Sequence, residues 1–213
     1  MPKPVLILGT RLLAAEVMDL ITEIPAYEVA GFVENMNRDL AGKQLEGYPV
    51  FWIDDIRKLV ETHVGVCALS TTQRKSYVEQ AADMGLRLET FIHPTARVSK
   101  RATLDEGCFV SAMATVAAFT KLGRCVFVNR GAMIGHHTTI GDFCTIQPGA
   151  NVAGAITIGE QSYVGMGAVV LDKLKIGKAC VIAAGAVVTK DFPDHVQLMG
   201  VPAKVVKENI EPK

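Results

Sequence analysis

Residues 132–142 read AMIGHHTTIGD, in which Ile134 and Ile140 stand six positions apart and each is followed by a glycine. The period continues in both directions: steps of six from Ile92 to Val188 meet Ile, Leu or Val seventeen times in succession. The residue two positions before each of the later sixteen is Ala, Ser, Thr or Cys in thirteen cases. An α-helix repeats about every 3.6 residues and a flat strand about every two, so neither explains a period of six.

A chain that turns a corner every six residues does explain this period. Three short strands then form a triangular rung of 18 residues, and rungs stack at about 4.8 Å, the spacing of a β-ladder. The aliphatic residue points into the interior, the small residue fits where the interior is narrow, and glycine is expected to relieve backbone strain at the corners. The 97 residues from 92 to 188 therefore form between five and six rungs.

The cysteines fit the same repeat. Cys108, Cys144 and Cys180 are spaced by 36 residues, or two rungs, so they are expected to stack on one face as small core residues. The chain has five cysteines and no CxxC pair. This composition predicts reduced thiols and neither a disulfide framework nor a metal site.

The first ninety residues have a different pattern, in which short apolar strands alternate with helical segments. Strands are expected at residues 5–10, 27–33, 48–51, 64–69 and 87–91. Helices are expected at residues 13–24, 54–60 and 72–84, with Asp54 as the N-cap of the second. This alternation predicts a small Rossmann-like α/β domain.

The overall composition excludes several classes of function. The formal net charge is zero, and no basic stripe or acidic tail is present, so a nucleic-acid partner is not expected. No stretch approaches the roughly 18 apolar residues of a membrane span, and the N-terminal apolar run is too short for a signal peptide. We therefore expect a cytoplasmic protein.

In this repeat, a glycine often follows the aliphatic residue directly, and a small residue lies three positions after the glycine. This pattern resembles the signature of the hexapeptide-repeat acyltransferases. This resemblance implies a left-handed parallel β-helix. A small α/β domain before the coil is similar to the branch of nucleotide-sugar N-acetyltransferases and sialic acid O-acetyltransferases. The matching motifs are GFV at 31–33, the connector IHPTA at 92–96 and GVPAK at 200–204.

The resemblance also implies the domain boundaries. Residues 1–91 are expected to form the α/β domain that binds the acceptor, and residues 92–200 the β-helix acyltransferase domain. Residues 201–213 are expected to form a short C-terminal helix and tail, with Pro202 in the first helical turn.

Residues 129–142 are similar to the active-site stretch of that branch, which implies that His136 is the general base. Asn129 is expected to be its hydrogen-bond partner, from the adjoining strand or from a neighbouring subunit. A neutral imidazole suits this role because acyl transfer from a thioester requires the attacking amine or hydroxyl to lose a proton near pH 7. Residues 18 positions on either side are Ala118 and Gly154, which leave room beside the imidazole. The family usually has an acid where this chain has His137, and Asp142 is a possible substitute for that acid.

The resemblance further implies binding sites for two substrates. Acetyl-CoA is expected to bind along the later rungs, between adjacent subunits of a homotrimer. The residues expected to contact it are Thr145, Gly154, Met166, Ala184, Pro202 and Lys204. No metal is expected. A sugar or nucleotide-sugar acceptor is expected at Thr10, Arg11, Glu34, Asn35 and Ser70. The turn at 9–13 reads GTRLL and lacks the second glycine pair and the histidine usual in this branch.

Two other functions use the same coil. The γ-class carbonic anhydrases bind zinc through three histidines, two of them five residues apart, whereas the close pair here is adjacent. A non-catalytic trimeric scaffold would keep the fold without the chemistry. The sequence leaves open the acceptor, the choice between N- and O-acylation, and the length of the acyl group.

Overall fold

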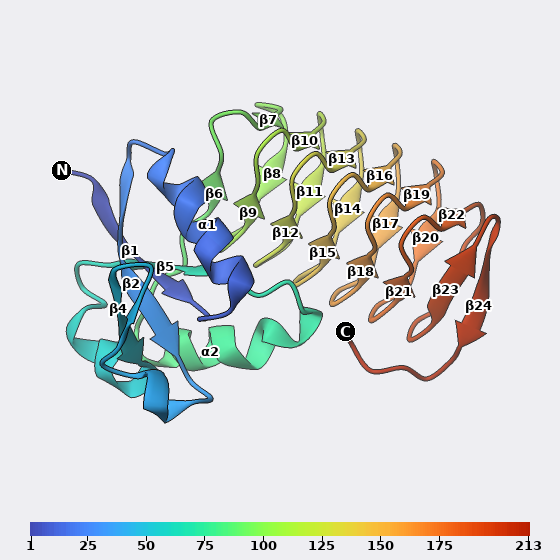
Figure 1. Cartoon of the computed structure of the whole chain (residues 1–213). Helices are drawn as coiled ribbons and strands as arrows, with labels where there is room; N and C mark the ends of the chain where they lie inside the picture. Colours follow the sequence, from blue (N-terminus) through green and yellow to red (C-terminus); the bar gives the residue numbers. More distant parts are fainter. The chain divides into compact units, whose positions relative to one another are not determined.

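The computed structural model describes residues 1–213, which divide into two compact units (Figure 1). The first unit comprises residues 1–70 and 74–94, and the second comprises residues 71–73 and 95–213. None of the helices has the length and apolar character that crossing a bilayer requires.

The first unit is a small parallel sheet with two α-helices. Its elements are β1 (Lys3–Leu8), α1 (Leu12–Thr22), β2 (Tyr27–Glu34), η1 (Arg38–Leu40), β3 (Gln44–Leu45), β4 (Tyr48–Trp52), η2 (Ile53–Lys58), β5 (Val64–Cys67), α2 (Lys75–Asp83) and β6 (Phe91–Ile92). The strand order is β3-β4-β2-β1-β5, in which only β3 is antiparallel to its neighbour. Strands β2, β4 and β3 lie on one side of β1, and β5 lies on the other. The predicted Rossmann-like arrangement is confirmed, and its switch point lies between β1 and β5.

Three local predictions for this unit were inaccurate. The helix expected at 54–60 is the 3-10 helix η2, which begins at Ile53 and ends at Lys58. The Asp54 carboxylate accepts a hydrogen bond from Trp52 Nε1 and does not cap the helix. The expected helix at 72–84 begins as the 3-10 turn η3 (Thr72–Arg74) before α2. The strand expected at 87–91 is reduced to an isolated bridge of Leu88 to Gly65 and the short β6.

The second unit is a triangular coil made of three parallel sheets (Figure 1). The first sheet contains β7 (Arg97–Val98), β10 (Thr115–Val116), β13 (Met133–Ile134), β16 (Asn151–Val152), β19 (Val169–Val170) and β22 (Val187–Val188). The second contains β8 (Thr103–Leu104), β11 (Lys121–Leu122), β14 (Thr139–Ile140), β17 (Thr157–Ile158) and β20 (Lys175–Ile176). The third contains β9 (Phe109–Val110), β12 (Phe127–Val128), β15 (Thr145–Ile146), β18 (Tyr163–Val164), β21 (Val181–Ile182), β23 (Gln197–Gly200) and β24 (Ala203–Lys207).

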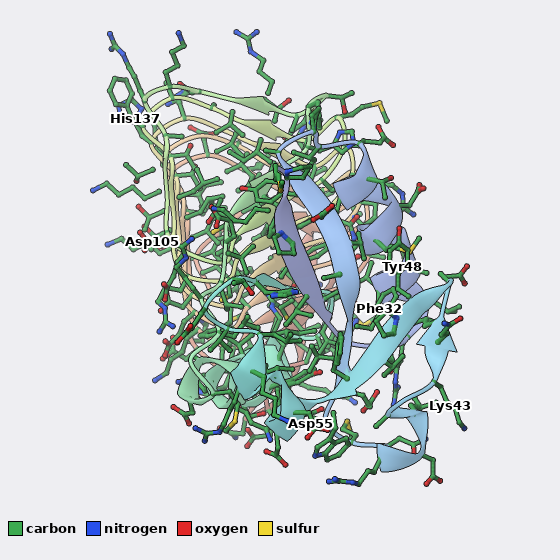
Figure 2. The ribbon with its side chains drawn as sticks, turned by 90° about the vertical axis from the view of Figure 1, so that its left-hand side faces the viewer. Phe32, Lys43, Tyr48, Asp55, Asp105 and His137 are labelled. Atoms are coloured by element: carbon green, nitrogen blue, oxygen red, sulfur yellow. The ribbon has the colours of Figure 1, made fainter.

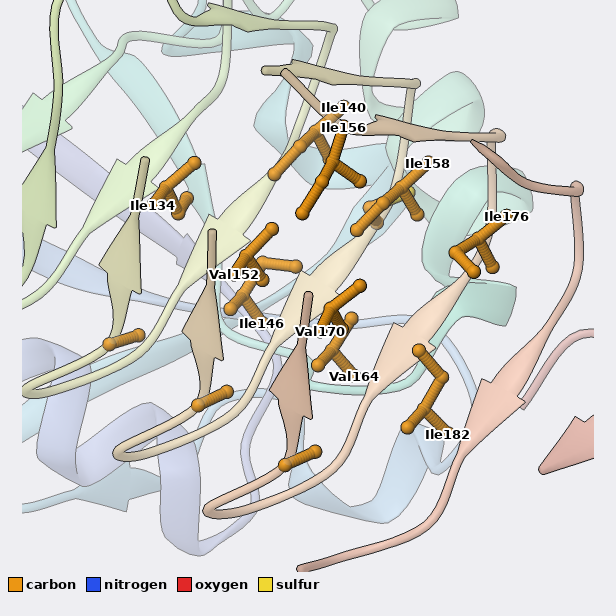
Figure 3. Packing of buried hydrophobic residues seen from close by; sticks show 14 of the residues in the cluster. Ile134, Ile140, Ile146, Val152, Ile156, Ile158, Val164, Val170, Ile176 and Ile182 are labelled. Carbon is orange, nitrogen blue, oxygen red and sulfur yellow. The ribbon is translucent and has the colours of Figure 1, made fainter. Parts of the chain in front are cut away.

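Neighbouring strands within each sheet pair residues that are 18 positions apart, as in Ile134 with Val152. This register confirms the rung length predicted from the repeat, and the chain folds as the predicted left-handed parallel β-helix. The aliphatic residues of successive rungs pack above one another in a single interior column (Figure 3). Because each rung buries its aliphatic residues only against the next, the core is continuous along the coil.

The small residues of the repeat also hydrogen-bond between rungs. Cys108, Cys144 and Cys180 are fully buried, as predicted, and the Sγ atom of each donates to a backbone carbonyl at 3.1 Å. The hydroxyls of Thr120, Thr138 and Ser162 make the equivalent bond at 2.9–3.1 Å. A polar hydrogen at this position is therefore tolerated in the core because a carbonyl one rung further on accepts it.

Most corners of the coil contain a residue in the left-handed conformation. From Gly107 to Gly185, the residue three positions after each inward-pointing aliphatic residue has a φ between +51° and +73°. The glycines directly after the aliphatic residues do not have positive φ, so the prediction that they relieve corner strain was wrong. A Cβ on Gly135 would lie 2.5 Å from the carbonyl carbon of Ala153, so close approach of the next rung requires this glycine.

The predicted C-terminal helix is also wrong. Strand β24 pairs antiparallel with β23 and extends the third sheet, and the turn between them includes Gly200, with a φ of +101°, and the cis Val201–Pro202 peptide bond. β-Branched residues such as Val205 and Val206 suit a strand better than a short helix. Pairing with β24 also covers the edge that β23 would otherwise leave open.

Candidate active site

His136 lies at an exposed corner of the coil, between β13 and β14. Its imidazole occupies space left by Gly154 on the next rung, since a Cβ on that glycine would stand 2.9 Å from both Cε1 and Nε2. The His136 carbonyl accepts a hydrogen bond from Ala155 N at 2.7 Å, which fixes the corner against that rung. The register inferred from Ile134 thus places His136 and Gly154 in contact, as predicted.

The adjacent His137 turns back towards His136. Its φ of +57° places it in the left-handed position of the corner, and the two Nδ1 atoms lie 3.0 Å apart. The two rings are almost perpendicular, with an interplanar angle of 88°. Figure 2 shows His137 at an outer corner of the coil.

Two residues that the sequence analysis did not single out support His137. The ring of Phe119, one rung earlier, lies 4.7 Å from the His137 ring, centroid to centroid. The guanidinium of Arg101, a further rung earlier, lies 5.3 Å from the Phe119 centroid. Counting back 18 residues from His137, and then 18 more, would have found both. Arg101, Phe119 and His137 form a column beside His136, which we call the His137 column.

Asp142 does not replace the missing acid. Its Oδ1 accepts a hydrogen bond from Arg124 N at 2.9 Å and lies over Gly123, in the corner row between the second and third sheets. This carboxylate therefore organises a different corner from the one that carries His136. The hydrogen-bonded neighbour of the His136 ring is His137.

Asn129 lies at the corner between β12 and β13, so one complete face of the coil separates it from His136. It is buried, and its Oδ1 accepts a hydrogen bond from Arg130 N at 2.8 Å. We call this row of corners, between the third and first sheets, the Asn129 edge. The row between the first and second sheets is the His136 edge. The two edges border the first sheet on opposite sides.

The residues predicted to bind the acyl donor are spread over several places in the chain. Gly154 lies on the His136 edge, whereas the exposed Met166 and Ala184 lie one rung apart on the Asn129 edge. Thr145 is fully buried on β15 of the third sheet. Pro202 and Lys204 are exposed in the β23–β24 hairpin. A single chain therefore does not bring these residues together.

A groove of about 810 Å³ opens on the first two rungs beside the His136 edge. It is lined by Arg97 and Lys100 and extends to Ala118, whose carbonyl accepts the His137 amide at 3.0 Å. Room beside Ala118 was expected from the sequence, but the cationic lining by Arg97 and Lys100 was not. Two cationic side chains in its wall favour an anionic or phosphorylated ligand.

In the first unit, the residues predicted to bind the acceptor follow the carboxyl ends of three parallel strands. Thr10 and Arg11 follow β1, Glu34 ends β2 with Asn35 after it, and Ser70 follows β5. Carboxyl ends beside a switch point are where ligands of open α/β sheets bind. Arg11 is exposed at the N-cap of α1 and its side chain makes no capping hydrogen bond.

The Glu34 carboxylate is hydrogen-bonded by neighbouring residues of the same unit. Its carboxylate accepts a hydrogen bond from the Thr10 hydroxyl and from the backbone amides of Asn35, Met36 and Asn37, the last three at 2.7–3.1 Å. Burial opposes its ionisation, but these donors outweigh burial and hold the pKa of the carboxyl below its usual range. Glu34 is thus placed to shape the turn after β2, while Asn35 donates to Gln80 at 3.0 Å.

Residues 119–154 and 155–190 match the family model of bacterial transferase hexapeptide, six repeats. The acetyltransferase domain of PglB from Neisseria gonorrhoeae, in complex with acetyl coenzyme A, is 30% identical with a TM-score of 0.88, covering 97% of this chain and 100% of that one. The chain belongs to the hexapeptide-repeat acyltransferases. A search among curated protein sequences finds no match.

Two further solved structures match almost the whole chain. Perosamine N-acetyltransferase from Caulobacter crescentus, a variant with one histidine replaced by asparagine in complex with CoA and GDP-perosamine, is 29% identical with a TM-score of 0.88. The match covers 96% of this chain and 97% of that one. WeeI from Acinetobacter baumannii is 26% identical with a TM-score of 0.87, over 95% and 99% of the two chains. No three His, Cys, Asp or Glu side chains of the chain are grouped in a way that could hold a metal ion.

Proposed function

We propose that this acyltransferase transfers an acetyl group from acetyl-CoA to an amino or hydroxyl group of a nucleotide-linked sugar, with His136 as general base. The observation that carries the proposal is the position of the His136 imidazole, exposed at a corner and seated against Gly154. It is supported by the acetyl coenzyme A and GDP-perosamine that similar proteins bind.

The chemistry follows from an exposed imidazole. Acetyl-CoA, when bound, supplies the acetyl group as a thioester. The lone pair of the acceptor nitrogen or oxygen attacks the thioester carbonyl carbon, and His136 Nε2 takes the proton from that amine or hydroxyl. When the carbon–sulfur bond breaks, the imidazolium returns this proton to the departing sulfur. The products are the amide or ester and free CoA, and the base is regenerated.

The site is complete only in an oligomer, and we propose a homotrimer. Gly154 and His136 lie on one edge of the first sheet, and Met166, Ala184 and Asn129 lie on the other, so a second copy has to bring the two edges together. The outward positions of the first sheet are polar at Arg97, Thr115 and Asn151 and apolar at Met133, Val169 and Val187, and Met133 is 46% exposed. The second sheet carries only threonine and lysine at its outward positions. We place the neighbouring copy against the first sheet because both the His136 edge and the Asn129 edge border it.

A nucleotide-linked acceptor agrees with the charge beside the site. Arg97 and Lys100 line the groove that ends at Ala118, one rung below His136, and a diphosphate supplies the complementary negative charge. Thr10, Arg11, Asn35 and Ser70 remain our candidates for contacts to the nucleotide in the α/β unit, with Glu34 organising the turn between them.

Calorimetric titration with acetyl-CoA, beside free CoA as a control, tests the donor half of the proposal. We expect saturable binding near one site per subunit in a protein that sediments as a trimer. A folded trimer that binds neither ligand would contradict the proposal and favour a non-catalytic scaffold.

A further inference from the structure

The replacement of the usual acid by His137 raises the question of what holds the His136 ring. A general base that works through Nε2 must carry its own proton on Nδ1, and the partner of that Nδ1–H fixes both the tautomer and the ring orientation. The atom 3.0 Å from His136 Nδ1 is Nδ1 of His137. One of these two nitrogens must carry the hydrogen and the other must accept it.

We infer that His137 is the positioning residue of this active site: its unprotonated Nδ1 accepts the hydrogen of His136 Nδ1 and so leaves His136 Nε2 free to act as the base. This inference rests on the proposed function, in which His136 takes the acceptor's proton. In this arrangement His137 is neutral, with its hydrogen on Nε2. When His136 becomes an imidazolium during the reaction, the same hydrogen bond becomes charge-assisted and stronger.

The backbone and the neighbouring rungs hold His137 in this orientation. The left-handed φ of +57° turns the residue back over the corner, so that adjacent side chains can meet. The Phe119 ring, 4.7 Å away, packs on the His137 imidazole and is itself covered by the Arg101 guanidinium. Arg101 reaches His137 only through Phe119, so the stack adds packing without placing a cation on the accepting nitrogen.

Two substitutions separate the hydrogen bond from the packing. His137→Phe keeps an aromatic ring against Phe119 but has no acceptor. His137→Asn loses the ring but offers an amide oxygen to His136 Nδ1, and asparagine tolerates the left-handed conformation. We expect kcat of the Phe variant to fall by roughly tenfold or more, with KM for both substrates within about twofold, because one orienting hydrogen bond is lost. The Asn variant should stay within about threefold of wild type.

His136→Ala, measured in the same assay, distinguishes the two levels of the proposal. If His136→Ala is inactive and His137→Phe turns over at the wild-type rate, the inference about His137 is wrong and the proposed function stands. Equal losses in the Phe and Asn variants would also overturn it, since the accepting atom would then be irrelevant. If His136→Ala remains active, the proposed function itself fails.

The tautomer provides a test that does not depend on a variant folding. In wild-type protein with ¹⁵N-labelled histidine, NMR reports which ring nitrogens carry hydrogen. We expect the hydrogen of His136 on Nδ1 and that of His137 on Nε2. A hydrogen on Nε2 of neutral His136 would overturn the inference.

Discussion

The imidazole of His136 lies against Gly154, in the space that a side chain on Gly154 would fill. This contact joins two consecutive rungs of the coil and leaves the imidazole exposed beside the first sheet. The chemistry that we propose depends on keeping that space empty.

Replacing Gly154 with alanine should therefore impair catalysis more than folding. The new Cβ would stand 2.9 Å from Cε1 and Nε2 of His136, and a side-chain ring can move away more easily than a backbone can. We expect kcat/KM to fall by about 10- to 100-fold, since a displacement near 1 Å is enough for such a loss. Thermal unfolding should change little. Asp172→Ala, in the same column one rung further on, is the control, and equal activity in the two variants would contradict the prediction.

Phe119→Ala should loosen the His137 column. His137 would lose its aromatic neighbour at 4.7 Å, and the hydrogen bond to His136 would be less well maintained. We expect kcat to fall by about two- to threefold, the lower end of what an aromatic contact of about 0.5–1.5 kcal/mol gives. Lys173→Ala, at an equivalent corner two rungs beyond His137, should keep wild-type kinetics. Comparable losses in both variants would point to a general effect on the coil.

The sequence predicted the β-helix in detail because each rung repeats the same local constraint. The spacing of six residues alone fixed the 18-residue register, the stacked cysteines and the contact of His136 with Gly154. The same counting, if applied to His137, reaches Phe119 and Arg101, so the His137 column could have been predicted as well.

Other features could not be predicted because they depend on pairing outside the repeat. The segment at 201–207 became strand β24 because β23 offered an unpaired edge, which local propensity does not reveal. By contrast, the separation of Met166 and Ala184 from Gly154 follows from the triangular cross-section of the coil, so counting along the repeat could have predicted it.

The cysteines should be unreactive in the native protein. All five are buried, and burial raises the pKa of the Cys67 and Cys180 thiols, which lowers their thiolate fraction near neutral pH. An aromatic disulfide reagent at pH 8 should therefore label none rapidly, and all five after denaturation. Rapid labelling of one or more thiols in the folded protein would show that the coil opens locally at that rung.

Glu34→Gln should reduce stability in a pH-dependent way. The pKa of Glu34 is lowered in the folded state, so its contribution is fully present above the pKa of the unfolded chain and is lost as pH falls through the folded value. At pH 7 we expect the free energy of unfolding to fall by about 1.5–3 kcal/mol, the range for hydrogen bonds to a charged group.

This difference should shrink as the pH falls below about 4.3, the ordinary value for glutamate. Denaturant unfolding at several pH values measures it, with Glu28→Gln, an exposed carboxylate on the same strand, as the control. A difference that does not change with pH would mean that Glu34 does not act through its charge.

The most direct test of the account is the release of free CoA from acetyl-CoA in the presence of nucleotide-linked amino sugars, measured for wild type and His136→Ala. We expect the wild type to turn over and the variant to keep the trimer and bind acetyl-CoA, with a rate lower by at least about 100-fold, the lower limit for loss of a general base. A variant that turns over at nearly the wild-type rate would contradict the role of His136 as the base.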